Sequence, residues 1–443
     1  MPDTASRTWR NWGGNQRCAP VEIARPRSVE DLTEVVKAAA KDGRRVKAVG
    51  SGHSFTDVAC TQGVQVRLDE YAGVLRYDPE ASTITVEAGI TLAALSGELA
   101  RRGLALANLG DIGYQTVAGA ISTGTHGTGV KLGGLATDVV GLQLVTADGS
   151  IVSCTADEEP EIFAAARVGL GSLGLISTVT LRCQPAFNLR AVEEPIRLDD
   201  VLSSIDELVD GNDHFEFFWV PHTGWALTKR NNHTDEPVSA GRGWRFVRDK
   251  VLFENVAFGA VTRVGRLRPQ WTPRLARIAP SSGRTEYVDR SDRVFTTPRW
   301  VRFVEMEYAI PRAAAVRVVE RVRRYVEESG LYVGFPVEVR FTAGDDIPLS
   351  TASGRQSCYV AVHMPQGVPY EQYFRGVEAI MDDVRGRPHW GKLHYQTATS
   401  LSSRYPGWER FHAVRSRTDP EGLFANAYTD RVLGPPSQTS GQG

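Results

Sequence analysis

The chain has 443 residues and a net charge of −1, with 42% hydrophobic and 23% charged residues. This length predicts two domains with ordinary globular cores. A nearly neutral chain has no field to attract a polyanion, so nucleic acid is not an expected partner. No apolar run reaches the length of a membrane span, so membrane association is not expected either.

The five cysteines are odd in number, widely scattered and free of any CxxC pair. This is not the pattern of a secreted disulfide framework. We therefore predict reduced thiols and a cytoplasmic protein.

Helices and strands alternate in the first part of the chain. Ser28 carries a capping signal for a helix that ends at Gly43, and a strand at 46–49 follows it. Further strands are predicted at 64–68, 83–87, 139–146, 151–153 and 177–182, with a second helix at 92–102.

Glycine, serine and threonine are dense before residue 185 and sparser afterwards. We place a domain boundary at Gln184-Pro185, which gives a cofactor domain at 15–184 and a substrate domain at 185–434. The second domain is predicted to contain strands at 214–220, 301–309, 333–341 and 357–363, and helices at 313–329 and 370–384. The predicted fold class is α+β.

Two passages of the second domain have an unusual composition. The Pro- and Arg-rich passage from 263 to 299 is predicted to form solvated loop and helix faces. Apolar and basic side chains interleave at 245–258, and this segment could instead lie on a membrane surface. Recovery of all the protein in the soluble fraction at low salt would exclude that interpretation.

The most informative stretch is the loop after the strand 46–49. It reads Gly50-Ser51-Gly52-His53-Ser54, and glycines on both sides of a serine can expose several backbone N–H groups to one anion. An ordinary strand-ending turn is the alternative. A second stretch, Gly119–Gly129, repeats this composition, so the two loops predict a long ligand with a pyrophosphate. Phe55 stands where a Rossmann fingerprint needs its third glycine, which excludes that fold.

These residues resemble the FAD domain of the vanillyl-alcohol-oxidase superfamily. The resemblance rests on the first loop together with Thr123-Gly124-Thr125-His126-Gly127. Within that superfamily the chain resembles the sugar-lactone and alditol oxidases, from about residue 15 to about residue 434. Taken alone, His53 is more often a structural histidine; the resemblance implies that it binds the flavin covalently.

The resemblance implies a two-domain flavoprotein, with an FAD-binding domain followed by a substrate (cap) domain. His126 is expected to pack near the pyrophosphate, and no metal is expected. The residues implied to contact FAD are Val49, Gly50, Ser51, Gly52, His53, Ser54, Asp111, Thr116, Gly119, Thr123, Gly124, Thr125, His126, Gly127 and Ile176.

Candidate catalytic residues lie in the second domain. Glu338 and Arg340 alternate on a predicted strand, so both project from one face of the sheet. An edge salt bridge is the alternative. The family's His-Trp-x-Lys sequence implies that Lys392 lies in the active site. Lys392 or Glu338 could take the substrate's hydroxyl proton, and Arg340 could stabilise charge on the reduced flavin. His363, on a neighbouring strand, is a candidate substrate contact.

Two further features come from the same resemblance. Asp111 replaces the serine of the family's Asn-Leu-Gly-Ser, which lies beside the flavin and substrate hydroxyls in relatives. We expect Asp111 to be protonated or paired with Arg340 or Lys392, and to favour lactones, which present fewer free hydroxyls near the reacting carbon. The segment Thr418–Tyr428 resembles the family's C-terminal signature and is expected to close the substrate domain against the flavin.

The predicted function is FAD-dependent oxidation of an aldono-1,4-lactone, such as L-gulono- or D-arabinono-1,4-lactone. Hydride would pass to flavin N5, with oxygen or another electron acceptor. The alternative is oxidation of an open-chain alditol, such as xylitol or sorbitol, on the same scaffold. A flavin-binding protein without turnover is disfavoured because Glu338, Arg340 and Lys392 are all present. The sequence leaves the acceptor, the exact sugar and the oligomeric state open.

Overall fold

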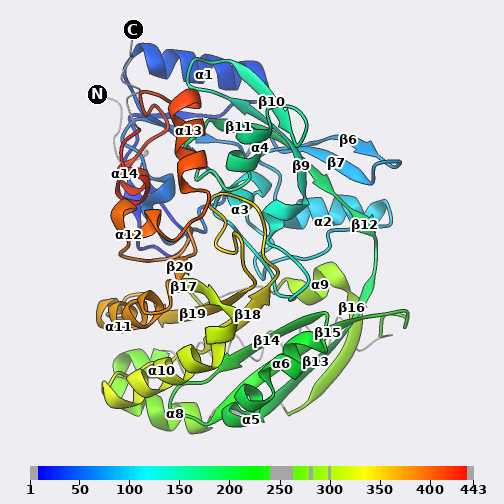
Figure 1. Ribbon diagram of the computed structural model, residues 1–443, viewed down its shortest axis with the longest axis vertical. Coiled ribbons are helices and arrows are strands. Elements are labelled where there is room, and N and C mark those ends of the chain that lie inside the picture. Colours follow the sequence, from blue (N-terminus) through cyan, green and yellow to red (C-terminus); the bar gives the residue numbers. More distant parts are fainter. Residues whose placement is uncertain (1–7, 240–262, 279–282, 298–300, 437–443) are drawn as a thin grey trace.

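The computed structural model describes residues 8–239, 263–278, 283–297 and 301–436, arranged as two parts one above the other (Figure 1). The N-terminal part is blue to cyan-green, and the second part is green to yellow. Within the described residues, every helix is too short or too polar to span a membrane. The candidate membrane-surface segment at 245–258 lies outside these residues.

Helix α1 shows how local sequence builds the N-terminal part. It spans Val29–Lys41, and the Ser28 side chain accepts a hydrogen bond from the backbone N–H of Asp31. Its buried residues, Leu32 and Val36 among them, recur at helical spacing and pack over a five-stranded sheet. The N-terminal part also contains a three-stranded parallel sheet. Its strand order is β3 (Glu22–Ala24), β5 (Val64–Arg67) and β4 (Val46–Val49).

The five-stranded sheet is antiparallel, and it contains the strands predicted at 83–87, 139–146, 151–153 and 177–182. Its order is β10 (Ile151–Thr155), β9 (Val139–Val145), β11 (Leu175–Arg182), β7 (Thr83–Glu87) and β6 (Val74–Asp78). The remaining elements of this part are β1 (Trp9–Arg10), β2 (Arg17–Cys18), η2 (Asp57–Ala59), α2 (Leu92–Arg101), β8 (Leu104–Ala105), α3 (Val117–Ser122), η3 (Leu135–Asp138), α4 (Pro160–Ala166) and β12 (Gln184–Pro185).

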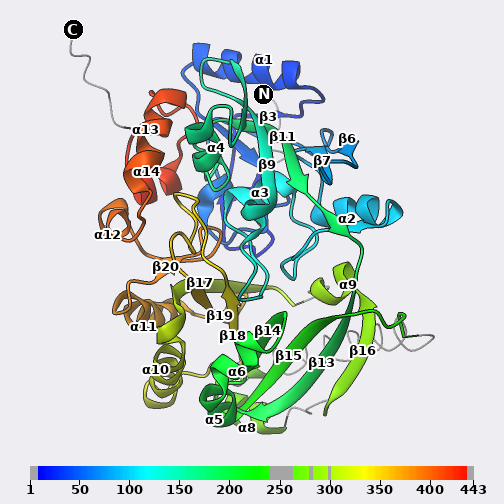
Figure 2. The same ribbon diagram turned by 45° about the vertical axis from the view of Figure 1, so that its right-hand side comes forward.

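One eight-stranded antiparallel sheet dominates the second part. Its order is β16 (Thr285–Arg290), β13 (Asn188–Arg197), β15 (Trp225–Thr234), β14 (His214–Trp219), β18 (Val337–Thr342), β19 (Ser357–Pro365), β17 (Phe303–Pro311) and β20 (Arg387–Pro388). Side chains alternate between its two faces. The apolar face packs on α5 (Leu198–Ser203), α6 (Ile205–Asp210), α10 (Ala315–Glu328) and α11 (Glu371–Asp382), which Figure 2 shows beside the sheet.

The C-terminal helices return to the N-terminal part, as the orange and red ribbons of Figure 1 show. They are α12 (Ala398–Ser402), α13 (Trp408–Thr418) and α14 (Ala427–Leu433). Phe424 and Tyr428 share a core with Val46 of β4, and the Asn426 amide donates to three carbonyls at and just after η2. The segment Thr418–Tyr428 therefore packs on β4 and η2, on either side of the first glycine loop, and Tyr428 also donates to the Trp390 carbonyl. Its expected closure of the substrate domain against the flavin stays a prediction. The boundary at Gln184-Pro185 stays a prediction.

Other differences from the predicted elements have local causes. Strand β18 begins at Val337 rather than at residue 333, because Gly334 and Pro336 interrupt the strand pattern. Strands β13 and β15 were not predicted, since polar side chains dilute their apolar alternation. The Arg-rich passage contains, besides the expected helical turns, the edge strand β16. Those turns are η4 (Pro269–Trp271), α8 (Thr272–Ile278) and α9 (Ser291–Phe295), and η5 (Arg312–Ala314) precedes α10.

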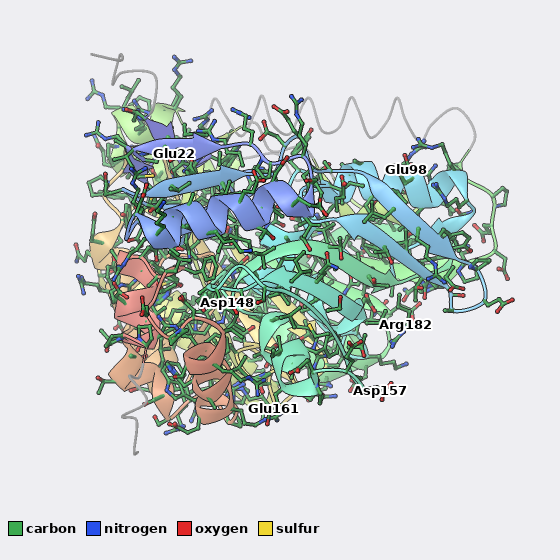
Figure 3. All side chains as sticks on the ribbon, turned by 90° about the horizontal axis from the view of Figure 1, so that it is seen from above. Glu22, Glu98, Asp148, Asp157, Glu161 and Arg182 are labelled. Atoms are coloured by element: carbon green, nitrogen blue, oxygen red, sulfur yellow. The ribbon has the colours of Figure 1, made fainter. Side chains whose placement is uncertain are left out.

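The outer face of the N-terminal part carries charged side chains. Figure 3 shows six of them from above, and Asp148, Asp157 and Glu161 among these are exposed. The two glycine loops lie elsewhere, toward the second part of the molecule.

Candidate active site

A cavity of about 1520 Å³ lies between the two parts. Among the described residues, it is lined by ten of the predicted site residues: His53, Ser54, Asp111, Thr123, Thr125, His126, Glu338, Arg340, His363 and Lys392. The other implied FAD contacts do not line this cavity: Val49, Gly50, Ser51, Gly52, Thr116, Gly119, Gly124, Gly127 and Ile176.

The polar face of the eight-stranded sheet forms one wall of the cavity. Strand pairing places Glu216 on β14 opposite Arg340 on β18, and His363 on β19 opposite Glu305 on β17. Glu338 faces the same way as Arg340, as the alternation predicted. All five side chains are largely buried, so the wall concentrates charge away from bulk water.

The Arg340 guanidinium contacts three carboxylates. Its Nη2 lies 2.5 Å from Asp111 Oδ1 and 2.6 Å from Glu338 Oε1, and its Nε donates to Glu216 Oε2 at 2.7 Å. Asp111 is therefore paired with Arg340, one of the two cations expected for it. Lys229 adds a second positive charge, 3.5 Å from Glu216 Oε1. Burial, aided by the Asp111 and Glu216 charges and opposed by Arg340, raises the pKa of Glu338 to about 7.

Lys392 belongs to a second charged group, centred on β17. Its ammonium donates to the Glu305 carboxylate, a residue that the sequence analysis did not single out. Burial lowers the pKa of Lys392, but Glu305 and Glu307 outweigh this effect and hold it above its usual value. Burial likewise acts to raise the pKa of Glu305, but Lys392 and His363 bring it to about 2. The pair is therefore ionised.

His363 connects the two charged groups. Its Nδ1–H donates to the Pro336 carbonyl at 3.0 Å, and its Nε2 lies 3.6 Å from Glu305 Oε1 and 3.9 Å from Glu338 Oε2. Burial lowers the pKa of His363, but the two carboxylates outweigh it and raise the pKa above its usual value. A substrate contact for His363 remains a prediction.

His126 joins the second glycine loop to the sheet. Its ring stacks on Tyr359 with centroids 3.6 Å apart, and its Nε2 lies 3.3 Å from Glu307 Oε1. With His389, these groups bring three potential metal-ligand atoms within 4.8 Å of one another. The Nδ1–H of His126 donates to the Gly127 carbonyl, and the Nδ1 of His389 accepts from the Gly391 N–H. The expected place of His126 near the pyrophosphate stays a prediction.

The first glycine loop has the features of an anion cradle. Gly50 approaches Thr116 so closely that an added Cβ would lie 2.3 Å from its Oγ1, and Gly52 has a φ of 71°. Within the described part of the chain, the backbone N–H groups of residues 51–54 donate to no protein acceptor. Such unpaired donors, grouped on one loop, match a phosphate oxygen or another anion.

His53 ends this loop at the cavity wall. Its ring lies 5.7 Å from that of Trp12 and 6.5 Å from that of Tyr114. Burial, and to a lesser degree the Lys392 charge, lowers the pKa of His53 to about 4. The imidazole is therefore neutral near pH 7, which is its nucleophilic form.

Comparisons with known proteins agree with this geometry. Residues 179–432 match the family model described as D-arabinono-1,4-lactone oxidase, and residues 20–155 match an FAD-binding domain. The L-gulono-1,4-lactone dehydrogenase of Mycobacterium tuberculosis is 49% identical over 96% of this chain and 99% of its own length. The L-gulonolactone oxidase of Bos taurus is 38% identical over 96% and 98%.

The chain belongs to the D-arabinono-1,4-lactone oxidase family. This family member is an FAD-dependent oxidoreductase, and its relatives favour the lactone prediction over the alditol alternative. A crystal structure of cholesterol oxidase from B. sterolicum superposes with a TM-score of 0.78, covering 96% of each chain at 17% identity. This likeness confirms the predicted two-domain FAD-binding fold.

The residues present fit FAD. The unpaired N–H groups of residues 51–54 suit its phosphates, and the adjoining cavity gives room for a ring system beside His53. A side chain at position 50 would collide with Thr116, so this contact by itself favours glycine there.

Three acidic residues of this lactone oxidase family member escaped the sequence analysis: Glu216, Glu305 and Glu307. A signal for them exists, because β17 reads Phe-Val-Glu-Met-Glu-Tyr and β14 reads His-Phe-Glu-Phe-Phe-Trp. A carboxylate within an apolar strand is the same signal that singled out Glu338.

Proposed function

We propose that this protein oxidises a hydroxyl group of an aldono-1,4-lactone, with L-gulono-1,4-lactone as the first candidate. The observation that carries the proposal is the wall formed by the buried residues Glu338, Arg340 and His363, with the partly buried Lys392 beside them, in the same cavity as residues of the two glycine loops. Such a wall offers both donors and acceptors to a small polyhydroxylated ring. The names of the relatives at 49% and 38% identity support gulonolactone.

The charge states of this wall assign roles to its residues. When bound, FAD supplies the acceptor for the hydride that leaves the carbinol carbon. Glu338 takes the hydroxyl proton, since a pKa of about 7 suits a base at neutral pH. Lys392 is already protonated and Arg340 stays charged, so both bind oxygen atoms and offset negative charge. Of the two candidate bases, the pKa shifts favour Glu338.

We further propose that FAD is attached covalently through His53. The neutral imidazole at the cavity wall supports this. Acid-precipitated native protein should keep its yellow colour and give a fluorescent band on a denaturing gel, and His53→Ala should lose both. Free FAD in the supernatant of the native protein would refute the attachment.

A substrate panel tests the function. Purified protein is assayed with L-gulono-1,4-lactone, D-arabinono-1,4-lactone, xylitol and sorbitol, each with oxygen and with an artificial electron acceptor. We expect turnover with the lactones, and the better acceptor separates an oxidase from a dehydrogenase. More efficient oxidation of either alditol than of any lactone would overturn the proposal.

We place the protein in the cytoplasm, because its five cysteines are all free and four are buried. Cell fractionation checks this, with an extracellular or membrane fraction as the contrary result.

A further inference from the structure

The loop that carries Lys392 is held by strand β17 through its backbone. The His389 N–H donates to the Glu307 carbonyl at 2.9 Å, and the Leu393 N–H donates to the Glu305 carbonyl at 2.8 Å. The loop therefore continues the hydrogen bonding of β17 on both sides of Lys392. Glu305 adds a side-chain contact, because its carboxylate accepts from the Lys392 ammonium.

The Lys392 side chain reaches from its own loop toward the end of the first glycine loop. Its Nζ lies 5.3 Å from the centre of the Phe55 ring, and its charge acts on His53. Several charged and titratable groups surround Lys392. They are Glu305 and Glu307 on β17, Glu338 on β18, His363 on β19, His53 on the first glycine loop, and His389 on the loop of Lys392 itself. Among these, Glu305 makes the direct contact.

A lysine in this position needs a carboxylate to stay charged. Only 22% of the Lys392 side chain is exposed, and 7% of the Glu305 side chain. Burial without a partner favours the neutral amine, and buried lysines readily lose their proton. Glu305 therefore decides whether Lys392 enters the active site as a cation or as a base.

We propose that Glu305 is a positioning residue that keeps Lys392 protonated and holds its ammonium at the cavity wall, near Phe55. Lys392 then remains a positive charge at a fixed position. Glu338 is the residue that takes up the substrate proton. The catalytic part of this assignment rests on the proposed function. The charge state of Lys392 can be tested without any substrate.

The direct test is amine labelling of the holoenzyme. Native protein and Glu305→Gln are treated briefly with acetic anhydride over a pH series, and labelling of the Lys392 peptide is followed by mass spectrometry. Only the neutral amine reacts, and a loss of one pKa unit raises its fraction tenfold. We expect Lys392 in Glu305→Gln to react at least about tenfold faster at neutral pH.

Two controls separate this effect from general loosening. Lys47 is buried and donates to three carbonyls far from β17, so its labelling should not change. Glu216→Gln removes another buried carboxylate from the same sheet face, one that contacts Arg340, and should leave Lys392 labelling as in the native protein. Equal Lys392 labelling in native protein and Glu305→Gln would overturn the proposal.

A conservative variant covers poor folding of Glu305→Gln. Glu305→Asp keeps the charge but is one methylene shorter, so Lys392 labelling should fall between the other two proteins. Labelling no faster than native in Glu305→Asp would count against the positioning role.

A kinetic readout links the residue to catalysis. Flavin reduction in Glu305→Gln should gain a limb that declines as pH rises, as Lys392 loses its proton, and native protein should lack it. If the native protein oxidises no lactone, the proposed function fails, but the labelling result still decides the role of Glu305.

Discussion

Asp111 shares the Arg340 guanidinium with Glu338 and Glu216, at a position where the family pattern has a neutral serine. An extra carboxylate next to Glu338 makes the loss of the Glu338 proton harder. The Asp111 carboxylate therefore acts on the pKa of Glu338, and we expect it to act on substrate hydroxyls as well. We therefore expect Asp111 to affect both the pH dependence of flavin reduction and the preference among substrates.

Asp111→Asn removes the charge and keeps the shape. Native flavin reduction by lactone should rise with pH through about 7, as Glu338 becomes the deprotonated base. Because the Asp111 charge helps to raise the pKa of Glu338, the variant should show this rise at lower pH. Anaerobic stopped-flow over a pH series measures it, with Asp157→Asn on the outer surface as the control. A rise at the same or a higher pH would contradict the account.

Asp111→Ser addresses specificity. A carboxylate only accepts hydrogen bonds, whereas a serine hydroxyl also donates, so the variant should accept alditol hydroxyls better. The ratio of kcat/KM for L-gulono-1,4-lactone to that for xylitol should fall. An unchanged or larger ratio would show that Asp111 does not set this preference.

Part of this site was visible in the sequence, and part was not. Glu338, Arg340, His363 and Lys392 were proposed from alternation and family pattern, and the structure brings them together. Their partners Glu216 and Glu305 lie on other strands, so pairing across the sheet decides their roles. Only the three-dimensional register shows that Glu305 faces His363.

At the scale of elements, helices and strands with a clear local sequence pattern were predicted correctly. Elements whose pattern is interrupted by polar residues were missed. Helix α10 was expected from its buried valines at helical spacing, and α1 from its cap. Strand β15 was missed because Lys229, Arg230 and two asparagines interrupt its apolar pattern. Chain order did not reveal that the C-terminal segment shares the core of the N-terminal part.

That returning segment makes Asn426 a stability determinant. Its side chain caps α14 and donates to the carbonyls of Asp57, Val58 and Cys60. Asn426→Ala should lower the free energy of unfolding by about 2–4 kcal/mol, from the lost cap and the unpaired carbonyls. Denaturant titration measures this, and Asp157→Ala on the exposed surface should change it by less than about 0.5 kcal/mol. Equal effects of the two substitutions would refute the role.

At the scale of the whole molecule, the cavity proposed to hold the flavin lies where the two parts meet. Residues of the glycine loops and of the eight-stranded sheet line one cavity, so bound FAD stabilises the native state over the unfolded chain. His53→Ala, with FAD bound only reversibly, should show a Tm that rises with added FAD. The native protein should show no such dependence, because its cofactor is attached. A native Tm that depends on added FAD would count against covalent attachment.

The central claim is that a lactone loses its hydroxyl proton to Glu338 in the FAD cavity. The most direct measurement is anaerobic flavin bleaching by L-gulono-1,4-lactone, in native protein and in Glu338→Gln of equal flavin content. The account predicts rapid, saturable bleaching of the native protein and a rate lower by about a hundredfold in the variant. An oxidised flavin that lactone does not bleach, or equal rates in the two proteins, would contradict it.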